Sequence, residues 1–380
     1  MQSFLQLVAH DLYAKIGNDL SRTALIFPNK RANLFFNEYL AGESDQPIWS
    51  PAAMSISDLF QKLSVQKSGD PIRLVCELYK VFKEETQSQE TLDDFYFWGE
   101  LLISDFDDVD KNMVDADKLF SNLQDLKNLM DDYEFLDKEQ EEAIQQFFQN
   151  FSIERRTELK EKFISLWDKL GTIYHHYREN LTELGIAYEG MLYRNVIEQL
   201  DTDQLKYDKY IFVGFNVLNK VENEFFRKLK DAGKALFYWD YDIFYTQQIR
   251  KHEAGEFLKR NLGEFPNELP ESFFDTFKEP KKIRYISAST ENAQARFLPE
   301  WIKMITDNHS QIAEEKEKEN AVVLCNEALL LPVLHSIPQE VKNVNITMGF
   351  PLAQTPVYSF INAVMELQTN GYRSDTGRFT

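Results

Sequence analysis

Cysteines are few in this sequence, and long apolar runs and secretion signals are absent. Only Cys76 and Cys325 are present, each inside an apolar stretch, which argues against a disulfide framework and against a thiolate metal site. The longest apolar runs, such as residues 328–334, fall far short of the roughly 20 residues that a membrane span requires. The N-terminus lacks a basic stretch followed by a continuous apolar core, so it does not read as a signal peptide. We therefore expect a soluble, cytoplasmic protein with no membrane association.

Positive charge is in the minority. Lys and Arg total 42 against 62 Asp and Glu, which gives a formal net charge of −20. This charge would repel a polyanion over most of the surface, so any contact with DNA has to be local, in a basic groove or through a partner chain. The hydrophobic content of 43% and the aromatic content of 14% predict packed cores, and the length of 380 residues predicts two or three domains.

Proline and glycine are sparse between residues 57 and 200, where Pro71 is the only proline. Acidic and amphipathic patterns alternate throughout this stretch, which predicts an almost wholly helical segment. The clearest helical patterns lie at 72–82, 117–130 and 159–181.

Strand patterns lie on both sides of the helical segment. Residues 23–27 predict a short buried strand, and a turn at Pro28 and Asn29 leads into a helix. The apolar face expected for that helix consists of Ala32, Phe35, Phe36, Tyr39 and Leu40. A strand that leads so directly into a helix is typical of the start of an α/β unit.

A strand–helix–strand unit is predicted further along the chain. The apolar run 210–215 is followed by Asn219, with Glu222 three positions later as in a capping box, and residues 235–240 form the next strand after Gly233. The expected inner face of the helix consists of Val221, Phe225, Phe226 and Leu229. Such a unit predicts two parallel strands joined by a right-handed crossover.

The chain reads as an α/β protein with an insertion and a second α/β series. Three prolines and mixed charge make residues 263–282 typical of a linker. Beyond it, strands are predicted at 283–288, 320–325 and 343–347, with helices from about Glu291, Glu327 and Thr355. The predicted domains are a first α/β domain (1–56 with 201–262), a helical insertion (57–200), the linker (263–282) and a second, truncated α/β domain (283–380).

This layout and five local stretches resemble the helicase-like N-terminal region of AddB-type helicase-nuclease subunits. ALIFPNKRANLFFNEYL resembles the family's strand, proline and helix at helicase motif Ia, and YDKYIFVGFNVLNKVENEFFRKL resembles its strand, Gly-Phe pair and helix at the Walker B position. ISASTENAQARFLPEWI, NAVVLCNEALLLPVLHSIP and NVNITMGFPLAQTPVYSFINAVMEL resemble, in that order, the start of the family's second domain. The resemblance implies two RecA-like domains, similar to P-loop NTPases and superfamily 1 helicases, with the helical insertion inside the first.

The groups that hydrolyse ATP are missing from these stretches. A P-loop needs Gly-x4-Gly-Lys-Ser/Thr, so that backbone N–H groups wrap the phosphates. The one Gly-Lys pair, Gly233 and Lys234, has Lys228 five positions before the glycine and Ala235 after the lysine. Val213 precedes the Gly-Phe pair, where the family usually has an acid that reaches Mg²⁺. The resemblance therefore implies degenerate Walker motifs, no ATP turnover and no cofactor in this chain.

Full-length members of the family carry a C-terminal PD-(D/E)XK nuclease with an iron–sulfur cluster. This sequence contains no Pro-Asp dipeptide and no cysteine cluster, so we expect no DNA cleavage by these residues. Such a nuclease domain would lie beyond Thr380.

The candidate DNA contacts are Lys30, Arg31, Asn216, Thr347 and Gly349. Lys30 and Arg31 follow the first strand, where α/β sheets place ligands and where motif Ia loops contact the DNA backbone. A solvated turn before the helix is the alternative interpretation. Gly349 also suits a simple turn before Pro351.

Other polar clusters read as structural. Asp240 and Asp242 mimic a Walker B acid, but without a P-loop they are interpreted as capping or loop carboxylates. Residues 105–110 lack the glycine and the glutamate of an EF-hand loop and are interpreted as a solvated acidic turn. His175 and His176 point about 100° apart on a helix, so they cannot chelate one metal from the same face, and we expect one to be partly buried. No catalytic, cofactor-binding or metal-binding residue is assigned.

Three functions stay open. The resemblance implies a non-catalytic, helicase-like scaffold and single-strand guide in recombinational repair of double-strand breaks. Its partners would be an AddA-like motor subunit and single-stranded DNA. The alternatives are an active ATP-dependent DNA helicase and a helical protein-interaction scaffold unrelated to DNA.

Overall fold

The computed structural model describes residues 2–120, 169–247, 252–305, 320–373 and 377–379. The chain divides into two compact units, Met1–Glu279 and Pro280–Thr380, and each is described by itself. Among the helices within the described ranges, none combines the length and the apolar character that a membrane crossing requires.

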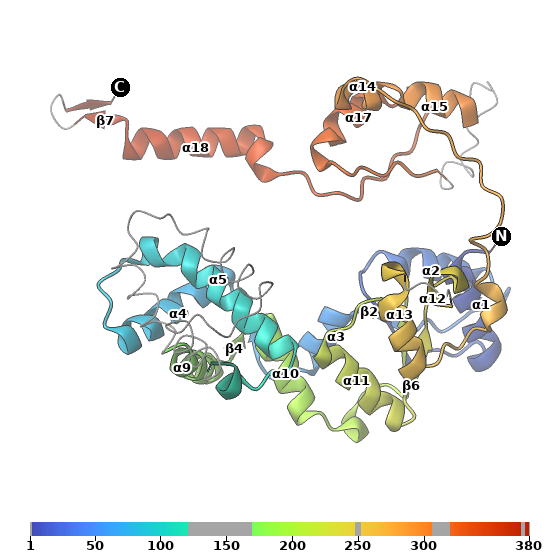
Figure 1. Ribbon diagram of the computed structural model, residues 1–380, viewed down its shortest axis with the longest axis horizontal. Helices are drawn as coiled ribbons and strands as arrows, with labels where there is room; N and C mark the ends of the chain where they lie inside the picture. Colours follow the sequence, from blue (N-terminus) through green and yellow to red (C-terminus); the bar gives the residue numbers. More distant parts are fainter. Residues whose placement is uncertain (1, 121–168, 248–251, 306–319, 374–376, 380) are drawn as a thin grey trace, which may run out of the picture. The chain divides into compact units, whose positions relative to one another are not determined.

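The first unit contains a four-stranded parallel sheet (Figure 1). Its strands are β1 (Thr23–Phe27), β2 (Ala52–Ser55), β5 (Lys209–Val213) and β6 (Ala235–Tyr238), in the order β2-β1-β5-β6. All three neighbouring pairs are parallel. The predicted α/β class and the strands predicted at 23–27, 210–215 and 235–240 are confirmed, with shorter ends, whereas β2 was not predicted.

Both faces of this sheet are buried, as parallel sheets require. Ile26 and Phe212 point to one face, which is covered by α3 (Ile56–Leu63), α10 (Glu189–Gln199) and α11 (Lys220–Asp231). Phe27 and Val213 point to the other face, which is covered by α1 (Phe4–Ile16) and α2 (Ala32–Ala41). The alternation along each strand therefore divides the core into two layers.

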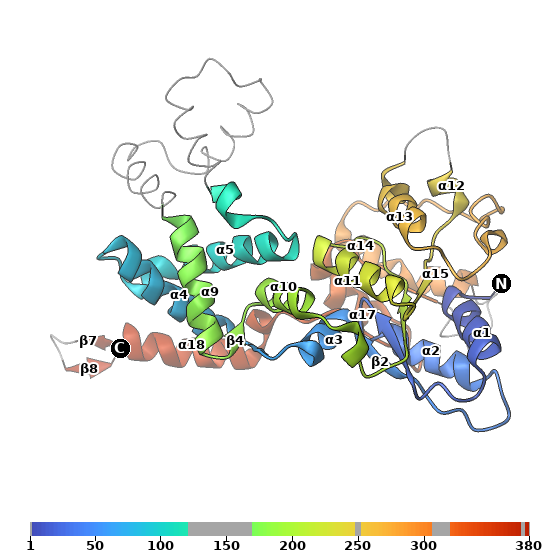
Figure 2. The same ribbon diagram turned by 90° about the horizontal axis from the view of Figure 1, so that it is seen from below.

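The helical insertion continues the first of these layers. Its described helices are α4 (Pro71–Thr86), α5 (Leu92–Lys111), α9 (Leu170–Glu183) and α10. Figure 2 shows α4, α5 and α9 grouped together, with α10 leading back toward the sheet. A two-residue parallel pair, β3 (Lys67–Ser68) with β4 (Ile186–Ala187), joins the two ends of the insertion. The predicted helical character is confirmed in this part, while residues 121–168 lie outside the described residues.

The helix between β5 and β6 follows its predicted pattern closely. Asn219 Oδ1 accepts from the Glu222 N–H at 2.8 Å, and Glu222 Oε2 accepts from the Asn219 N–H at 3.1 Å, so the predicted capping box is present. The four predicted inner residues are buried, and Gly233 follows the helix with a φ of +66°. On α2 the prediction is wrong at Phe35, which is 41% exposed because Phe36 and Leu40 fill the space above the sheet.

The segment predicted as a linker packs against the first unit along much of its length. It follows α12 (Ile243–Thr246) and α13 (Glu253–Glu264), and Phe265, Leu269 and Phe274 are buried. Trp239 Nε1 donates to the Phe265 carbonyl at 2.9 Å, and the Glu268 N–H donates to the Phe237 carbonyl at 2.9 Å, which satisfies part of the free edge of β6. This part of residues 263–282 therefore belongs to the first unit.

The second unit lacks the predicted parallel strands within its described residues. It contains α14 (Glu291–Arg296), α15 (Leu298–Ile305), α17 (Leu330–Ser336), α18 (Pro356–Thr369) and a short antiparallel pair, β7 (Tyr372–Arg373) with β8 (Arg378–Phe379). The predicted strands 283–288, 320–325 and 343–347 are wrong, since none of them joins a ladder. Tyr285 is 93% exposed and Val323 is 84% exposed, so the apolar pattern there has no neighbouring strand to pack on.

Candidate functional site at the carboxyl edge of the sheet

The strand order creates a switch point between β1 and β5. The chain passes from β1 through α2 to β2 on one side, and from β5 through α11 to β6 on the other side. In open parallel sheets, ligands bind outside the carboxyl ends of the strands at such a point. Residues 28–31 and 214–219 form the two loops at this edge, so three of the predicted contacts, Lys30, Arg31 and Asn216, lie on it.

The loop after β1 uses its own side chain to start the next helix. Asn29 Oδ1 accepts from the N–H groups of Arg31 at 3.1 Å and Ala32 at 3.4 Å. These are among the N–H groups that a phosphate would otherwise bind at a helix start. The amides of Arg31 and Ala32, at the start of α2, are therefore already satisfied within the chain.

The two cations of this loop have different surroundings. Lys30 Nζ lies 3.0 Å from Asp58 Oδ1 at the start of α3. The Ser55 hydroxyl, followed by Lys30, lowers the pKa of Asp58, so this carboxylate stays charged beside the lysine. The Arg31 side chain is exposed and makes no ion pair with any described residue. Arg31 is thus the cation that is available to an incoming anion.

The loop after β5 carries no metal-binding acid. Val213, at the position of the expected acid, is buried in the sheet core. Gly214 has a φ of +73°, which only glycine adopts readily, and the exposed Asn216 uses its carbonyl to accept from Asn261 Nδ2 at 2.6 Å. Asn219 closes the loop by capping α11. The loop therefore offers backbone and amide groups, but no carboxylate that could hold Mg²⁺.

Of the two acids after β6, Asp242 behaves as the sequence predicted. Asp242 accepts from the N–H groups of Phe244 at 2.8 Å, Thr276 at 2.9 Å and Phe277 at 2.9 Å. Burial opposes ionisation of Asp242, but these backbone donors outweigh it and lower the pKa. Burial raises the pKa of Asp240. Asp242 is a capping and loop carboxylate, and no group of three or more metal-ligating side chains occurs among the described residues.

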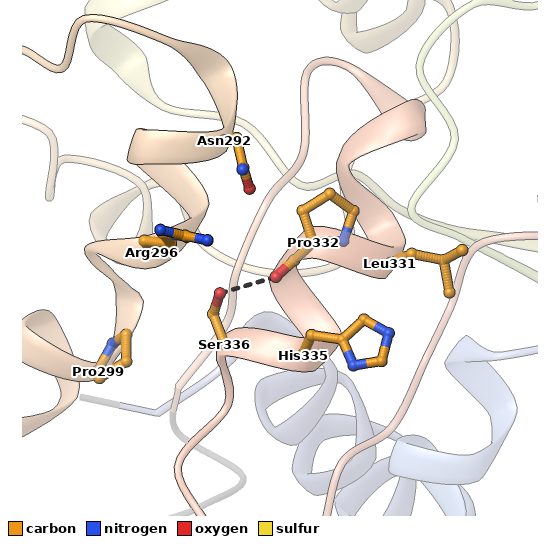
Figure 3. Close-up of a pocket in the computed structure, with 7 residues that line it drawn as sticks. All are labelled: Asn292, Arg296, Pro299, Leu331, Pro332, His335 and Ser336. Atoms are coloured by element: carbon orange, nitrogen blue, oxygen red, sulfur yellow. Dashed lines mark hydrogen bonds between the residues drawn. The ribbon is translucent and has the colours of Figure 1, made fainter.

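The other two candidate contacts lie in the second unit. Thr347 and Gly349 belong to a stretch without regular structure, and Gly349 has open space around it. The same unit has a pocket of about 670 Å³ between α14 and α17 (Figure 3). It is lined by Asn292, Arg296, Pro299, Leu331, Pro332, His335 and Ser336. Arg296 is the one permanent cation in this set, and Ser336 Oγ donates to the Pro332 carbonyl at 2.7 Å.

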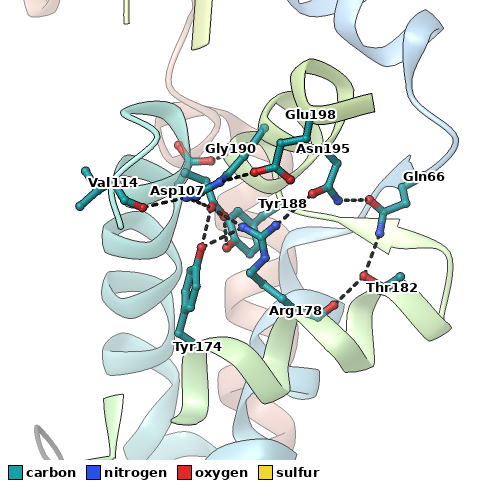
Figure 4. Close-up of polar contacts among 12 residues, drawn as sticks. Gln66, Asp107, Val114, Tyr174, Arg178, Thr182, Tyr188, Gly190, Asn195 and Glu198 are labelled. Carbon is teal, nitrogen blue, oxygen red and sulfur yellow. Dashed lines mark hydrogen bonds and ion pairs between the residues drawn. The ribbon is translucent and has the colours of Figure 1, made fainter. Parts of the chain in front are cut away.

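A buried ionic cluster around Asp110 was not predicted. Residues 105–110 form the end of α5, so the interpretation as a solvated acidic turn is wrong. Asp110 is fully buried and accepts from the hydroxyls of Tyr174 at 2.6 Å and Tyr188 at 2.5 Å. It also pairs with Arg178 and, at 3.3 Å, with Arg194 (Figure 4).

The cluster joins three helices of the insertion. The two tyrosine hydroxyls and the two guanidinium groups come from α9, α10 and the turn before α10, and all converge on one carboxylate of α5. Arg178 also donates to Asn195 Oδ1 at 2.9 Å, and Arg194 donates to the Val114 carbonyl at 2.9 Å. Every partner is satisfied, so the cluster fixes the helices and leaves no group free for a reaction.

The two adjacent histidines point to different partners, as predicted. His175 Nε2 lies 2.8 Å from Asp117 Oδ1, and His176 Nδ1 lies 2.9 Å from Glu85 Oε1. His175 is exposed and His176 is partly buried. They therefore do not form a common metal site.

Comparison with known proteins adds no assignment. No protein-family model matches the chain, and no curated protein matches it.

Proposed function

We propose that this chain is a non-catalytic, helicase-like scaffold and single-strand guide of an AddB-type recombinational DNA-repair complex. The main support is the carboxyl edge of the sheet at its switch point. This edge presents the exposed cation Arg31, but it has neither a P-loop nor an acid at the end of β5, the groups that hold phosphates and Mg²⁺ for ATP hydrolysis.

The chemistry of phosphoryl transfer favours the non-catalytic reading over an active helicase. Phosphoryl transfer depends almost entirely on positioning and on neutralisation of charge by a P-loop and a bound metal. Here Asn29 accepts from the first amide of α2, that of Ala32, and Val213 replaces the acid after β5. ATP would therefore find neither a P-loop nor the metal-binding acid of the Walker B position at this edge.

A role beside DNA requires a local positive site, because the net charge is −20. Lys30 and Arg31, in the loop after β1, and Lys220, the first residue of α11, are exposed at the switch point. Lys30 is partly neutralised by Asp58, so Arg31 would carry most of a contact with a phosphate. A single contact of this kind gives weak binding that depends on salt, which suits a guide that acts next to a motor subunit.

ATP turnover is the first test. The chain is assayed with Mg-ATP, with and without single-stranded DNA, and no turnover above background is expected. Robust turnover that DNA stimulates would contradict the proposal and favour the active helicase.

DNA binding by matched arginine variants is the second test. Arg31→Ala should weaken binding of labelled single-stranded DNA, in the presence of an AddA-type motor subunit, and should reduce the slope of log affinity against log salt by about 0.7. Arg22→Ala is the control, because Arg22 lies at the opposite end of β1, paired with Asp208 at 2.6 Å. Equal effects of both variants, or no DNA binding at any salt concentration, would contradict the guide role.

A further inference from the structure

The negative charge of the chain is concentrated in the helical insertion. Residues 57–200 contain 31 Asp and Glu against 16 Lys and Arg, so they carry −15 of the net charge of −20. The rest of the chain is nearly balanced by comparison. A nucleic acid would be repelled by this insertion, whereas a basic protein surface would be attracted.

The acidic side chains on the two faces of helix α5 differ in whether they form ion pairs. On the inner face, Asp107 pairs with Lys111 at 2.8 Å, and Asp110 is held by two arginines. On the outer face, no Lys or Arg among the described residues pairs with an acid. The outer acids are Asp93, Glu100, Asp105 and Asp108, all of them exposed. The charge on this face is therefore uncompensated.

The same outer face exposes large apolar side chains. Phe97 is 69% exposed and Leu101, one helical turn later, is 45% exposed. The Phe97 ring contacts Trp98, with centroids 5.8 Å apart. Partial desolvation, and then the neighbouring charge of Asp108, raise the pKa of Asp105. Apolar side chains surrounded by charged residues are typical of a protein interface.

We propose that the outer face of α5 docks a protein partner that presents lysine or arginine side chains around an apolar groove. Phe97 and Leu101 enter the groove, and the four outer acids pair with the basic rim. The occupant follows from charge complementarity, since the uncompensated acids exclude a polyanion and favour a cationic surface. This surface is separate from the carboxyl edge of the sheet, so the inference does not rest on the proposed function.

The first experiment measures whether the surface is open in the free, full chain. Hydroxyl-radical footprinting should label Phe97 as readily as the control Phe360, a residue of the same type that is 70% exposed. Strong protection of Phe97 in the free chain would overturn the proposal. Self-association of the chain that Phe97→Ser abolishes would assign the surface to a second copy and would also overturn it.

The second experiment uses defined probes for the partner. A labelled helical peptide of lysine and leucine, with its leucines on one side, should bind the full chain, whereas a glutamate and leucine peptide of the same pattern should not. Phe97→Ser with Leu101→Ser should weaken binding of the lysine peptide at least about ten-fold, because central apolar anchors carry most of the affinity of an interface. Glu100→Lys with Asp105→Lys should weaken it mainly through the association rate, and less so at high salt.

Matched surface changes elsewhere serve as controls. Val65→Ser and Asp45→Lys alter an exposed apolar residue and an exposed acid outside α5, and both should bind the lysine peptide as the parent chain does. Circular dichroism verifies that every variant is folded. The proposed surface would be overturned if the control variants weakened binding equally, or if substitution of Phe97 and Leu101 left binding unchanged. Either result would show that peptide binding depends only on the net charge of the chain.

Discussion

Substitution of the buried Asp110 gives the most direct test of the interactions that hold the helical insertion together. Replacing Asp110 by alanine leaves two tyrosine hydroxyls and two guanidinium groups without their common acceptor. Removal of one partner from a buried ion pair costs about 3–5 kcal/mol, because the charge that remains is uncompensated. Native domains are stable by only about 5–15 kcal/mol, so the helices of the insertion should open far more often in the variant.

Further substitutions measure how much individual members of the cluster contribute to the free energy of unfolding. Tyr188→Phe removes one hydrogen bond to a charged group and should cost about 2 kcal/mol. Arg178→Met in the Asp110→Ala background should restore part of the lost stability, since it removes a buried charge that has lost its partner. A simple loss of packing would not show this recovery, because the second substitution would only add to the first.

Hydrogen exchange is the appropriate assay, because a chain of two units need not unfold in one step. Mass spectrometry of peptides from α5, α9 and α10 should show faster exchange in Asp110→Ala, by a factor that matches the lost free energy. Asp108→Ala, an exposed neighbour on the same helix, is the control and should exchange as the parent chain does. If both variants exchange alike, the cluster does not hold the insertion together, and the reasoning fails.

Two further predictions concern the same helices. At Gly190 a Cβ would meet the carbonyl oxygen of Asp107, so Gly190→Ala should force α10 away from α5 and lower the urea midpoint by an amount equivalent to about 1–3 kcal/mol, whereas Gly263→Ala, with open space around it, should not. Burial, and then the charge of Asp110, raises the pKa of Tyr188 above its ordinary value of 10.0. The folded state therefore keeps this proton longer than the unfolded state, so stability should be steady up to about pH 10 and fall above it, by up to about 1.4 kcal/mol per pH unit for this group. Denaturation between about pH 8 and pH 11 should show a smaller fall in Tyr188→Phe, and an unchanged fall would contradict this cause.

Local patterns predicted the first unit well because its strands lie between two buried faces. After their first residues, Thr23 and Lys209, β1 and β5 are continuous runs of buried, mostly apolar residues, since helices cover both sides. The capping box at Asn219 depends only on neighbours in sequence. β2 was missed because its sequence, AAMS, is only four residues long and contains no β-branched or aromatic residue. Phe35 was assigned to the wrong side because periodicity alone does not tell which part of an apolar stripe reaches the sheet.

The errors in the second unit have a different cause. The stretches at 283–288, 320–325 and 343–347 carry the same apolar signal as β5, but a strand also needs neighbours that complete its hydrogen bonds. Tyr285 and Val323 remain in solvent in the structure. An apolar pattern thus indicates that a segment is suited to burial, but it does not identify the surface against which the segment would pack.

The candidate site could be placed from the sequence, although its electrostatics could not. The position of Lys30 and Arg31 after a strand was enough to put them at the sheet edge. The pairing of Lys30 with Asp58 depends on how the start of α3 lies beside the loop after β1, which no local pattern describes. Asp110 carried a usable signal, since it follows Phe106 and Val109 on the buried stripe of α5, but its partners come from other helices.

The helix starts at the carboxyl edge explain why a sheet with a switch point has no evident means of gripping phosphate. Asn29, Ser55 and Asn219 each accept from one N–H group in the first turn of the helix that follows their strand. A side-chain cap and a phosphate compete for the same N–H groups. The capping side chain has the advantage because it is covalently attached next to these groups, whereas a phosphate has to bind from solution. An anion at this edge is therefore held by side-chain cations, and Arg31 is the cation of the loop after β1 that pairs with no described carboxylate. One such contact adds little affinity and much salt dependence, so a chain that guides DNA from this edge needs a partner to supply the rest of the binding free energy.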